Sequence, residues 1–167
     1  KEIEEIEKVR DYSANIYFVP AFTGLGAPFW DPDARGTIIG ITRSTSRKDI
    51  IRAAVESLAY RTRDVCVAFE KDSGMKLREM RIDGGVSQSK VFCRILSDLT
   101  GLEIKAFDFK EYTALGVMYA AGLGLGIWDD RRDIAGHIGS RACTPKISND
   151  LRNRLYENWV RAVSRSR

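Results

Sequence analysis

The sequence predicts an α/β fold built on a short parallel sheet. The main observation is that helical and strand patterns alternate from residue 47 onward, which is typical of strands joined by crossover helices. The second is composition: 167 residues, 44% hydrophobic and 30% charged, are enough to bury a core and exclude a disordered chain. The third is that no run of about 18 apolar residues occurs, which excludes a membrane-spanning helix.

The first part of the chain predicts a helix and a pair of strands. Residues 2–12 carry apolar side chains at helical spacing. Residues 15–19 are aromatic and β-branched, which predicts a strand that Pro20 ends. Residues 22–36 contain too many glycines and prolines for a helix or a regular strand. Because residues 36–42 return to a strand pattern, we expect the two strands to pair across this long loop.

A long helix is predicted from residue 47 to residue 72. Ser46 or Thr45 can cap its start, and Gly74 suits its end. Apolar or small side chains recur every three or four residues and predict one buried stripe, made of Ile51, Val55, Leu58, Thr62, Val65 and Phe69.

A strand, a helix and a second strand follow. Residues 79–83 predict a strand with Met80 and Ile82 facing inward. Residues 90–100 predict an amphipathic helix, and Gly101 suits its end. Its apolar face consists of Val91, Phe92, Ile95, Leu96 and Leu99. Residues 102–107 predict the next strand.

Two further helices complete the expected elements. The helix over 113–125 is nearly all apolar or small, so we expect it to be buried all round. Gly116, Ala120 and Gly124 would give it one flat face that admits a close neighbour. The last helix, over 148–163, carries one apolar side formed by Leu151, Leu155, Trp159 and Val163.

Charge argues against a nucleic-acid reader. The net charge is +4, yet the basic excess lies in residues 131–167, whereas residues 1–130 are slightly acidic. A nucleic-acid reader typically shows a basic face across its body. We therefore interpret the basic segment as a solvated or capping helix.

The cysteines and the single histidine indicate a protein of a reducing compartment, and their pattern predicts no metal site. Cys66, Cys93 and Cys143 are widely spaced, which predicts neither disulfides nor zinc and favours the cytoplasm. Cys66 and Cys93 fall among apolar helix positions, and the single His137 favours a structural role. Phosphate-loop, nucleophile-elbow and metalloprotease motifs are absent from the sequence.

The best local candidate for a ligand site is the turn between Met80 and Lys90. It leaves a strand, passes through Gly84 and Gly85 and opens a helix, so free backbone N–H groups could face a phosphate or an adenine ring. An ordinary tight turn is the alternative. Asp83 could be a catalytic carboxylate or a turn cap, and we favour the cap.

Four segments together resemble the glycerol kinases of the FGGY carbohydrate kinase family. They are VPAFTGLGAPFWDPDARG (19–36), IIRAAVESLAYRTRD (50–64), RIDGGVS (81–87) and TALGVMYAAGLGLGIW (113–128). The resemblance covers residues 15–128, in order. It implies the C-terminal, ribonuclease-H-like domain of an actin-like ATPase fold, with its first strands upstream. This agrees with a chain that opens at Lys1 within an acidic, helix-like segment, as expected for a piece of a longer protein. The resemblance divides the chain into a connecting helix (1–14), the domain core (15–130) and a basic helical tail (131–167).

The resemblance also implies which part of the chemistry lies here. Adenine nucleotide would bind at Gly84, Gly85 and Ser89, with ATP and Mg²⁺ used by the parent enzyme. The polyol pocket, the general-base Asp and a phosphate-binding turn would all lie N-terminal to this segment. We therefore expect no catalytic residue and no metal ligand here, no kinase activity from this segment alone, and glycerol bound through the N-terminal half. A homo-oligomer is compatible with the sequence, and neither nucleic acid nor a membrane is expected as partner.

The sequence departs from the family pattern at three positions. Ser89 stands where the family usually has Asn, Lys90 where an acidic residue is expected and Ser44 where Gly is expected. A hydroxyl is shorter than an amide and offers one donor, so Ser89 would weaken nucleotide binding or serve only as a helix N-cap. Two alternatives to a glycerol kinase follow: a kinase for another polyol or sugar, and a non-catalytic regulatory homologue.

Overall fold

The computed structural model describes residues 12, 15–107, 112–128 and 139–167. The predicted helix over 2–12 and His137 therefore lie almost wholly outside the described residues. The elements in chain order are β1 (Tyr17–Val19), β2 (Thr37–Ile39), α2 (Arg47–Ser73), β3 (Glu79–Ile82), the short 3₁₀ helix η1 (Gly85–Gln88), α3 (Lys90–Thr100), β4 (Glu103–Phe107), α4 (Tyr112–Gly124), β5 (Ser140–Cys143) and α6 (Asn149–Ser164). Within these residues, no helix combines the length and apolar character needed to cross a bilayer.

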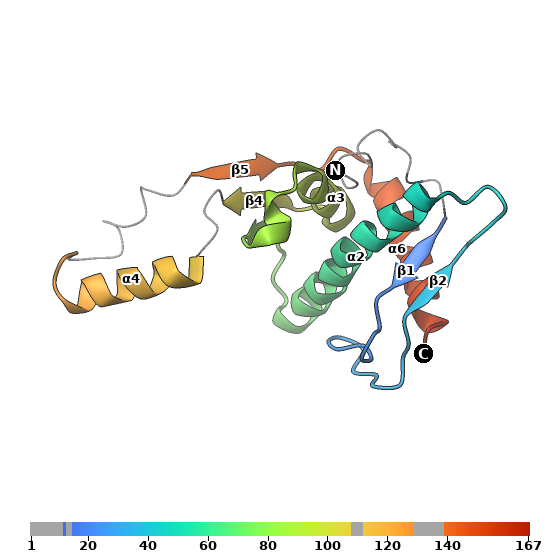
Figure 1. Cartoon of the computed structure of the whole chain (residues 1–167), viewed down its shortest axis with the longest axis horizontal. Coiled ribbons are helices and arrows are strands. Elements are labelled where there is room, and N and C mark those ends of the chain that lie inside the picture. Colours follow the sequence, from blue (N-terminus) through green and yellow to red (C-terminus); the bar gives the residue numbers. More distant parts are fainter. Residues whose placement is uncertain (1–11, 13–14, 108–111, 129–138) are drawn as a thin grey trace.

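The strands form two separate sheets (Figure 1). β1 and β2 pair antiparallel across the long loop, which confirms the expected pair. The second sheet has the order β3-β4-β5, and its β3–β4 pair is parallel, as the helix–strand alternation predicts. β5 adds antiparallel to the other edge of β4 and was not predicted. It lies within the segment interpreted as a helical tail, so that segment also completes the sheet.

Side chains and glycines cap the helices as the sequence suggests. Ser46 rather than Thr45 caps α2: its hydroxyl accepts from the N–H of Asp49, whose carboxylate accepts from the N–H of Ser46 at 2.8 Å. This reciprocal pair is a capping box. Gly74 ends α2 in the left-handed conformation that favours glycine.

The predicted buried stripe of α2 is confirmed only in part: Ile51 and Val55 pack partly buried against the core, but further along the helix the prediction is wrong. Leu58, Val65 and Phe69 are 44%, 49% and 45% exposed. The buried face is instead largely charged, polar or small, and consists of Arg52, Ala53, Glu56, Ser57, Ala59, Tyr60 and Asp64. These charged side chains can be buried because they form hydrogen bonds with one another or with donors on other helices. For example, Arg52 Nε donates to Glu56 Oε1 at 2.6 Å.

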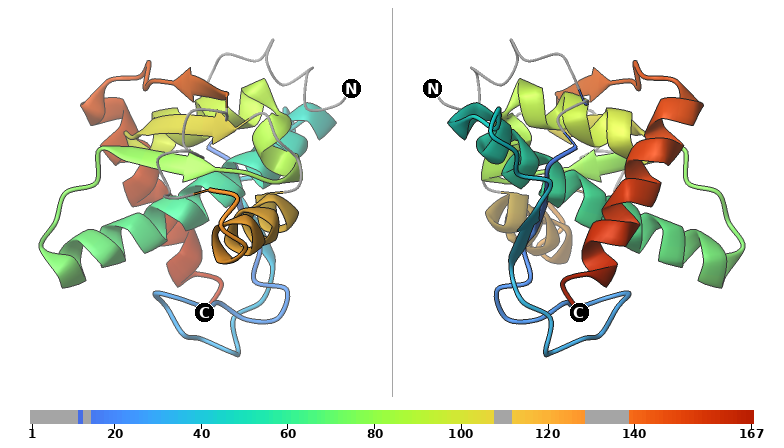
Figure 2. Two further views of the ribbon diagram at one scale, coloured as in Figure 1. Left: turned by 90° about the vertical axis from the view of Figure 1, so that its left-hand side faces the viewer. Right: turned by 90° about the vertical axis from the view of Figure 1, so that its right-hand side faces the viewer.

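The core lies where α2, α3 and α6 meet β1 and β4. The apolar face predicted for α3 is buried throughout. The Trp159 side chain of α6 is fully buried and stacks on Tyr60 of α2, with ring centroids 5.0 Å apart. Figure 2 shows α6 lying across α2. The helix predicted over 148–163 is thus confirmed, and its apolar side belongs to the core.

α4 confirms the predicted helix but not its burial. It lies apart from the other elements (Figure 1), and Val117 and Met118 are 67% and 50% exposed. On the expected flat face, a Cβ added to Gly116 or Gly124 would meet no atom within 4 Å, and Ala120 is exposed. The Trp128 side chain packs on Gly122 and Tyr119, but no other described helix or strand covers α4. Apolar composition predicts burial only where a partner is present.

Candidate functional site

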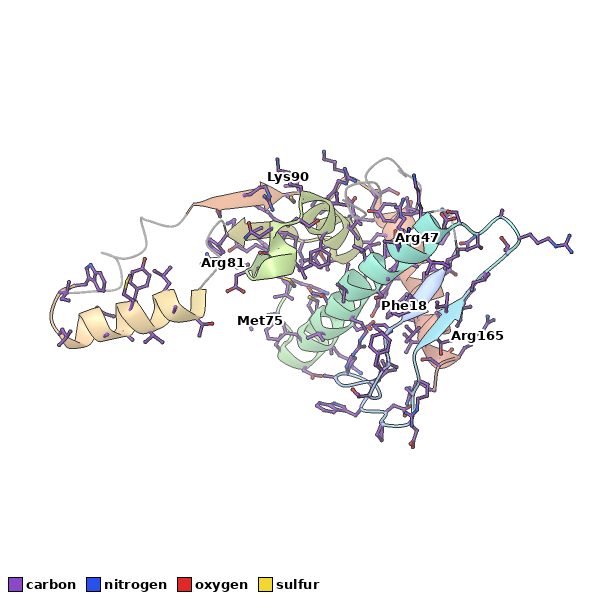
Figure 3. The ribbon with its side chains drawn as sticks, viewed as in Figure 1. Phe18, Arg47, Met75, Arg81, Lys90 and Arg165 are labelled. Carbon is purple, nitrogen blue, oxygen red and sulfur yellow. The ribbon has the colours of Figure 1, made fainter. Side chains whose placement is uncertain are left out.

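The candidate site is the turn from Asp83 to Ser89, which joins β3 to α3. Because β3 and β4 are parallel, their carboxyl ends meet at one edge of the sheet, and the turn lies at that edge. In open α/β sheets this is the edge where ligands bind. Arg81 and Lys90 flank the turn, as Figure 3 shows.

The two glycines have different structural roles. Gly84 adopts φ 84° and ψ 179°, a conformation that a side chain would strain. Gly85 has no such constraint, and a Cβ added to either glycine would meet no atom within 4 Å. No acceptor for the N–H of Gly85 is present among the described residues. This side of the turn is therefore bare backbone with a donor available to a ligand.

Hydrogen bonds of the buried residue Ser87 hold the turn in place. Ser87, which is 2% exposed, donates through its N–H and its hydroxyl to the Gly84 carbonyl, at 3.2 and 2.7 Å. The Ser87 carbonyl accepts from Arg141 Nη2 on β5 at 2.9 Å and from the Cys93 thiol on α3 at 3.1 Å. The turn is thus fastened to both neighbouring elements and is preorganised.

Ser89 is the N-cap of α3. Its hydroxyl oxygen accepts from the N–H of Phe92 at 3.2 Å, which leaves the hydroxyl hydrogen as its one donor. The structure therefore brings all three predicted residues, Gly84, Gly85 and Ser89, onto one turn.

Sequence reasoning missed two residues that hold this turn in place. Gln88 donates through Nε2 to the Phe107 carbonyl at 3.2 Å, which ties the turn to the end of β4. Arg141 holds the turn from β5. Neither had a sequence signal, because each acts on a residue distant in the chain.

The expectation that Asp83 caps the turn is wrong. Its side chain is exposed and makes no hydrogen bond within the described part of the chain. The Gly84 carbonyl is instead satisfied by Ser87. Asp83 is therefore a solvated carboxylate at the carboxyl end of β3.

The described residues offer no further catalytic or metal centre. Among them, no three His, Cys, Asp or Glu side chains gather to hold a metal ion. Burial raises the pKa of the Cys66 and Cys143 thiols, which disfavours the nucleophilic thiolate. A cavity lined by Arg52, Glu56 and Tyr60 has about 10 Å³, room for a single water.

Comparison with known proteins gives one family. The model of the FGGY family of carbohydrate kinases, C-terminal domain, matches residues 2–125. A glycerol kinase of Petrotoga mobilis is 47% identical over 161 residues, covering 96% of this chain and 32% of that protein. Glycerol kinase 2 of Thermotoga maritima is 45% identical over 166 residues, covering 99% of this chain and 34% of that protein. The chain thus spans about a third of the length of these curated relatives.

Solved structures agree. The crystal structure of Plasmodium falciparum glycerol kinase with ADP matches with a TM-score of 0.89 and 32% identity, covering 99% of this chain and 33% of that one. A xylulose kinase from Rhodospirillum rubrum matches with a TM-score of 0.80 and 22% identity, covering 98% of this chain and 33% of that one. The second match shows a shared fold only.

Proposed function

Because the chain belongs to the FGGY family of carbohydrate kinases, we propose that it is the C-terminal, nucleotide-side part of a glycerol kinase. The intact protein would transfer the γ-phosphoryl group of ATP to a hydroxyl of glycerol and release ADP. The fold class expected from the resemblance, the ribonuclease-H-like C-terminal domain of an actin-like ATPase, is confirmed.

The observation that carries the proposal is the identity to glycerol kinases over almost the whole chain, 43–47% in the first matches. The xylulose and gluconate kinases among the structural matches are only 19–24% identical, which favours glycerol over another polyol or sugar as the substrate.

We assign nucleotide contact to Gly84, Gly85 and Ser89. Three features support this assignment: the turn lies at the carboxyl edge of parallel strands, its glycine side is open, and Ser87 fixes its shape. The open glycines would let the adenosine part lie against the backbone. The Ser89 hydroxyl has one donor left for it, so we expect weak binding by the isolated chain.

Phosphoryl transfer depends mainly on positioning the reactants and on stabilising the developing charge. The turn can position one reactant only. We assign no catalytic residue to this chain, because the family resemblance places the general-base Asp N-terminal to it. Mg²⁺ is expected to enter bound largely to the phosphates of ATP. The chain alone is therefore proposed to be inactive.

Exposed apolar side chains support the view that further protein covers this chain. Leu58, Val65 and Phe69 form an uncovered stripe on α2, and α4 is uncovered as well. Large exposed apolar patches mark contact surfaces. The proposed occupant is the remainder of the kinase, since the relatives are about three times as long. We further propose that the enzyme acts in the cytoplasm, and a homo-oligomer stays compatible with the sequence.

The test is an assay of ATP-dependent phosphorylation by the intact polypeptide, with glycerol, xylulose and gluconate as parallel substrates. We expect glycerol to have the highest kcat/KM and the 167-residue chain to show no turnover. Preference for another substrate would reassign the specificity, whereas a folded intact protein without any turnover would favour the regulatory homologue.

A further inference from the structure

A second hollow is lined by none of the residues of the turn. It is a groove of about 270 Å³ between the β1–β2 ribbon and α6. Its lining includes Asn15, Tyr17, Ile39, Asn158, Arg161 and Arg165. Figure 3 shows Arg165 beside this ribbon. The volume approaches the lower end of the range for small-molecule pockets, roughly 300 Å³.

The groove carries two positive charges without counter-ions. Arg161 lies in the last turn of α6, and Arg165, four positions on, is the residue that follows the end of the helix; both side chains are exposed. No ion pair to either is found within the described ranges, although Glu157 lies one turn before Arg161. No acidic residue lines the groove. Arg167, by contrast, pairs with Asp31 at 2.8 Å.

The remaining lining suits a ligand with both a polar and a carbon part. The amide side chains of Asn15 and Asn158 border the groove, and Ile39 and Ala162 form apolar lining. The ribbon end is closely packed, because a Cβ on Gly40 would lie 2.1 Å from the Asn15 carbonyl oxygen. The position of Asn15 is therefore built into the fold rather than left to a free loop.

We propose that this groove binds a small organic phosphate monoester. Guanidinium groups match phosphate oxygens in geometry and charge, and two of them can share one dianion, whereas a carboxylate is satisfied by one. The carbon part would lie against Ile39 and Ala162. The site is separate from the Gly84–Gly85 turn, so it does not depend on the kinase assignment.

The test is an NMR titration of the ¹⁵N-labelled chain with inorganic phosphate and with glycerol 2-phosphate, at constant ionic strength set with NaCl. We expect backbone shifts around Asn15, Gly40 and Arg165, and tighter binding of the monoester. The double substitution Arg161→Gln/Arg165→Gln should weaken binding about tenfold or more, since two charge-assisted contacts are lost.

The matched control is Lys71→Gln/Arg78→Gln, which removes the same charge from two exposed cations at the end of α2 and the loop after it. It should leave the affinity unchanged. Equal weakening in both double variants would overturn the proposal, because the effect would then be net charge alone. Shifts clustered outside the groove, or equal affinity for phosphate and its monoester, would also contradict it.

Discussion

The indole N–H of Trp159 on α6 donates to both carboxylate oxygens of Asp64 on α2, with each Nε1–O distance 3.1 Å. The same carboxylate accepts from the Tyr156 hydroxyl and from Arg61 Nη1, both at 2.9 Å. Burial raises the pKa of Asp64, and these donors oppose the rise. One buried carboxyl therefore joins the last helix to the longest one.

Replacing Asp64 by Ala should destabilise the chain strongly. The substitution leaves the N–H of Trp159 and the hydroxyl of Tyr156 buried without their acceptor, at a cost of about 3–5 kcal/mol in the free energy of unfolding. Urea denaturation followed by tryptophan fluorescence measures this. The exposed control Asp33→Ala should change stability by less than about 0.5 kcal/mol. Similar losses in both variants would contradict the role given to Asp64.

The elements themselves were largely predictable, whereas the burial of α2 and α4 was not. α3 has a conventional apolar face, so its bounds and burial follow from periodicity. The buried face of α2 contains Asp64, whose partner Trp159 lies 95 residues away and gives no local signal. Periodicity therefore selected an apolar stripe whose first members, Ile51 and Val55, are partly buried, but whose later members the described residues leave exposed.

The site was found from the strand–Gly-Gly–helix order, which needs no distant contact. The hydrogen bond from β5 that holds the turn was not predicted, because its donor, Arg141, lies 54 residues after its acceptor, the Ser87 carbonyl. β5, which carries Arg141, has a weak strand pattern and forms by pairing with the edge of β4. Long-range pairing of this kind cannot be seen in a local window of sequence.

Two substitutions of Ser89 test its role as a helix cap separately from its proposed contact with the nucleotide. Ser89→Ala removes the acceptor for the N–H of Phe92 and should lower stability by about 1 kcal/mol. Ser89→Asn keeps a capping acceptor and adds donors, so stability should be kept and ADP affinity should rise several-fold. Thermal unfolding and ADP titration measure the two effects. An unchanged ADP affinity in Ser89→Asn would remove Ser89 from the proposed contact.

Gly85→Val tests whether the open glycine side is used. A Cβ at Gly85 meets nothing within 4 Å, so the variant should fold with nearly unchanged stability, yet the added side chain occupies the surface assigned to the nucleotide. ADP affinity should fall at least tenfold, about 1.4 kcal/mol. Gly26→Val is the matched control, since its Cβ also meets nothing within 4 Å. Undiminished ADP binding by Gly85→Val would contradict the assignment.

Asp49 should contribute to stability in a pH-dependent way. Hydrogen bonds from the hydroxyl and the N–H of Ser46 hold the pKa of Asp49 below its ordinary value of 3.8. A depressed carboxyl pKa stabilises the folded chain above the unfolded pKa, and this contribution is lost as the pH falls through the folded pKa. Asp49→Asn should therefore be less stable at pH 7 and should show a smaller loss of melting temperature between pH 5 and pH 2, about the range in which the carboxyl titrates. An equal loss of melting temperature in the two proteins between pH 5 and pH 2 would contradict this.

The most direct test of the central claim is a titration of the ¹⁵N-labelled chain with ADP, read residue by residue by NMR. If the chain is the nucleotide side of a kinase, the largest backbone shifts will cluster at Gly84, Gly85 and Ser89 and the first turn of α3, and they will saturate. Saturable shifts that cluster elsewhere, or no shifts at millimolar ADP in the folded chain, would contradict the account.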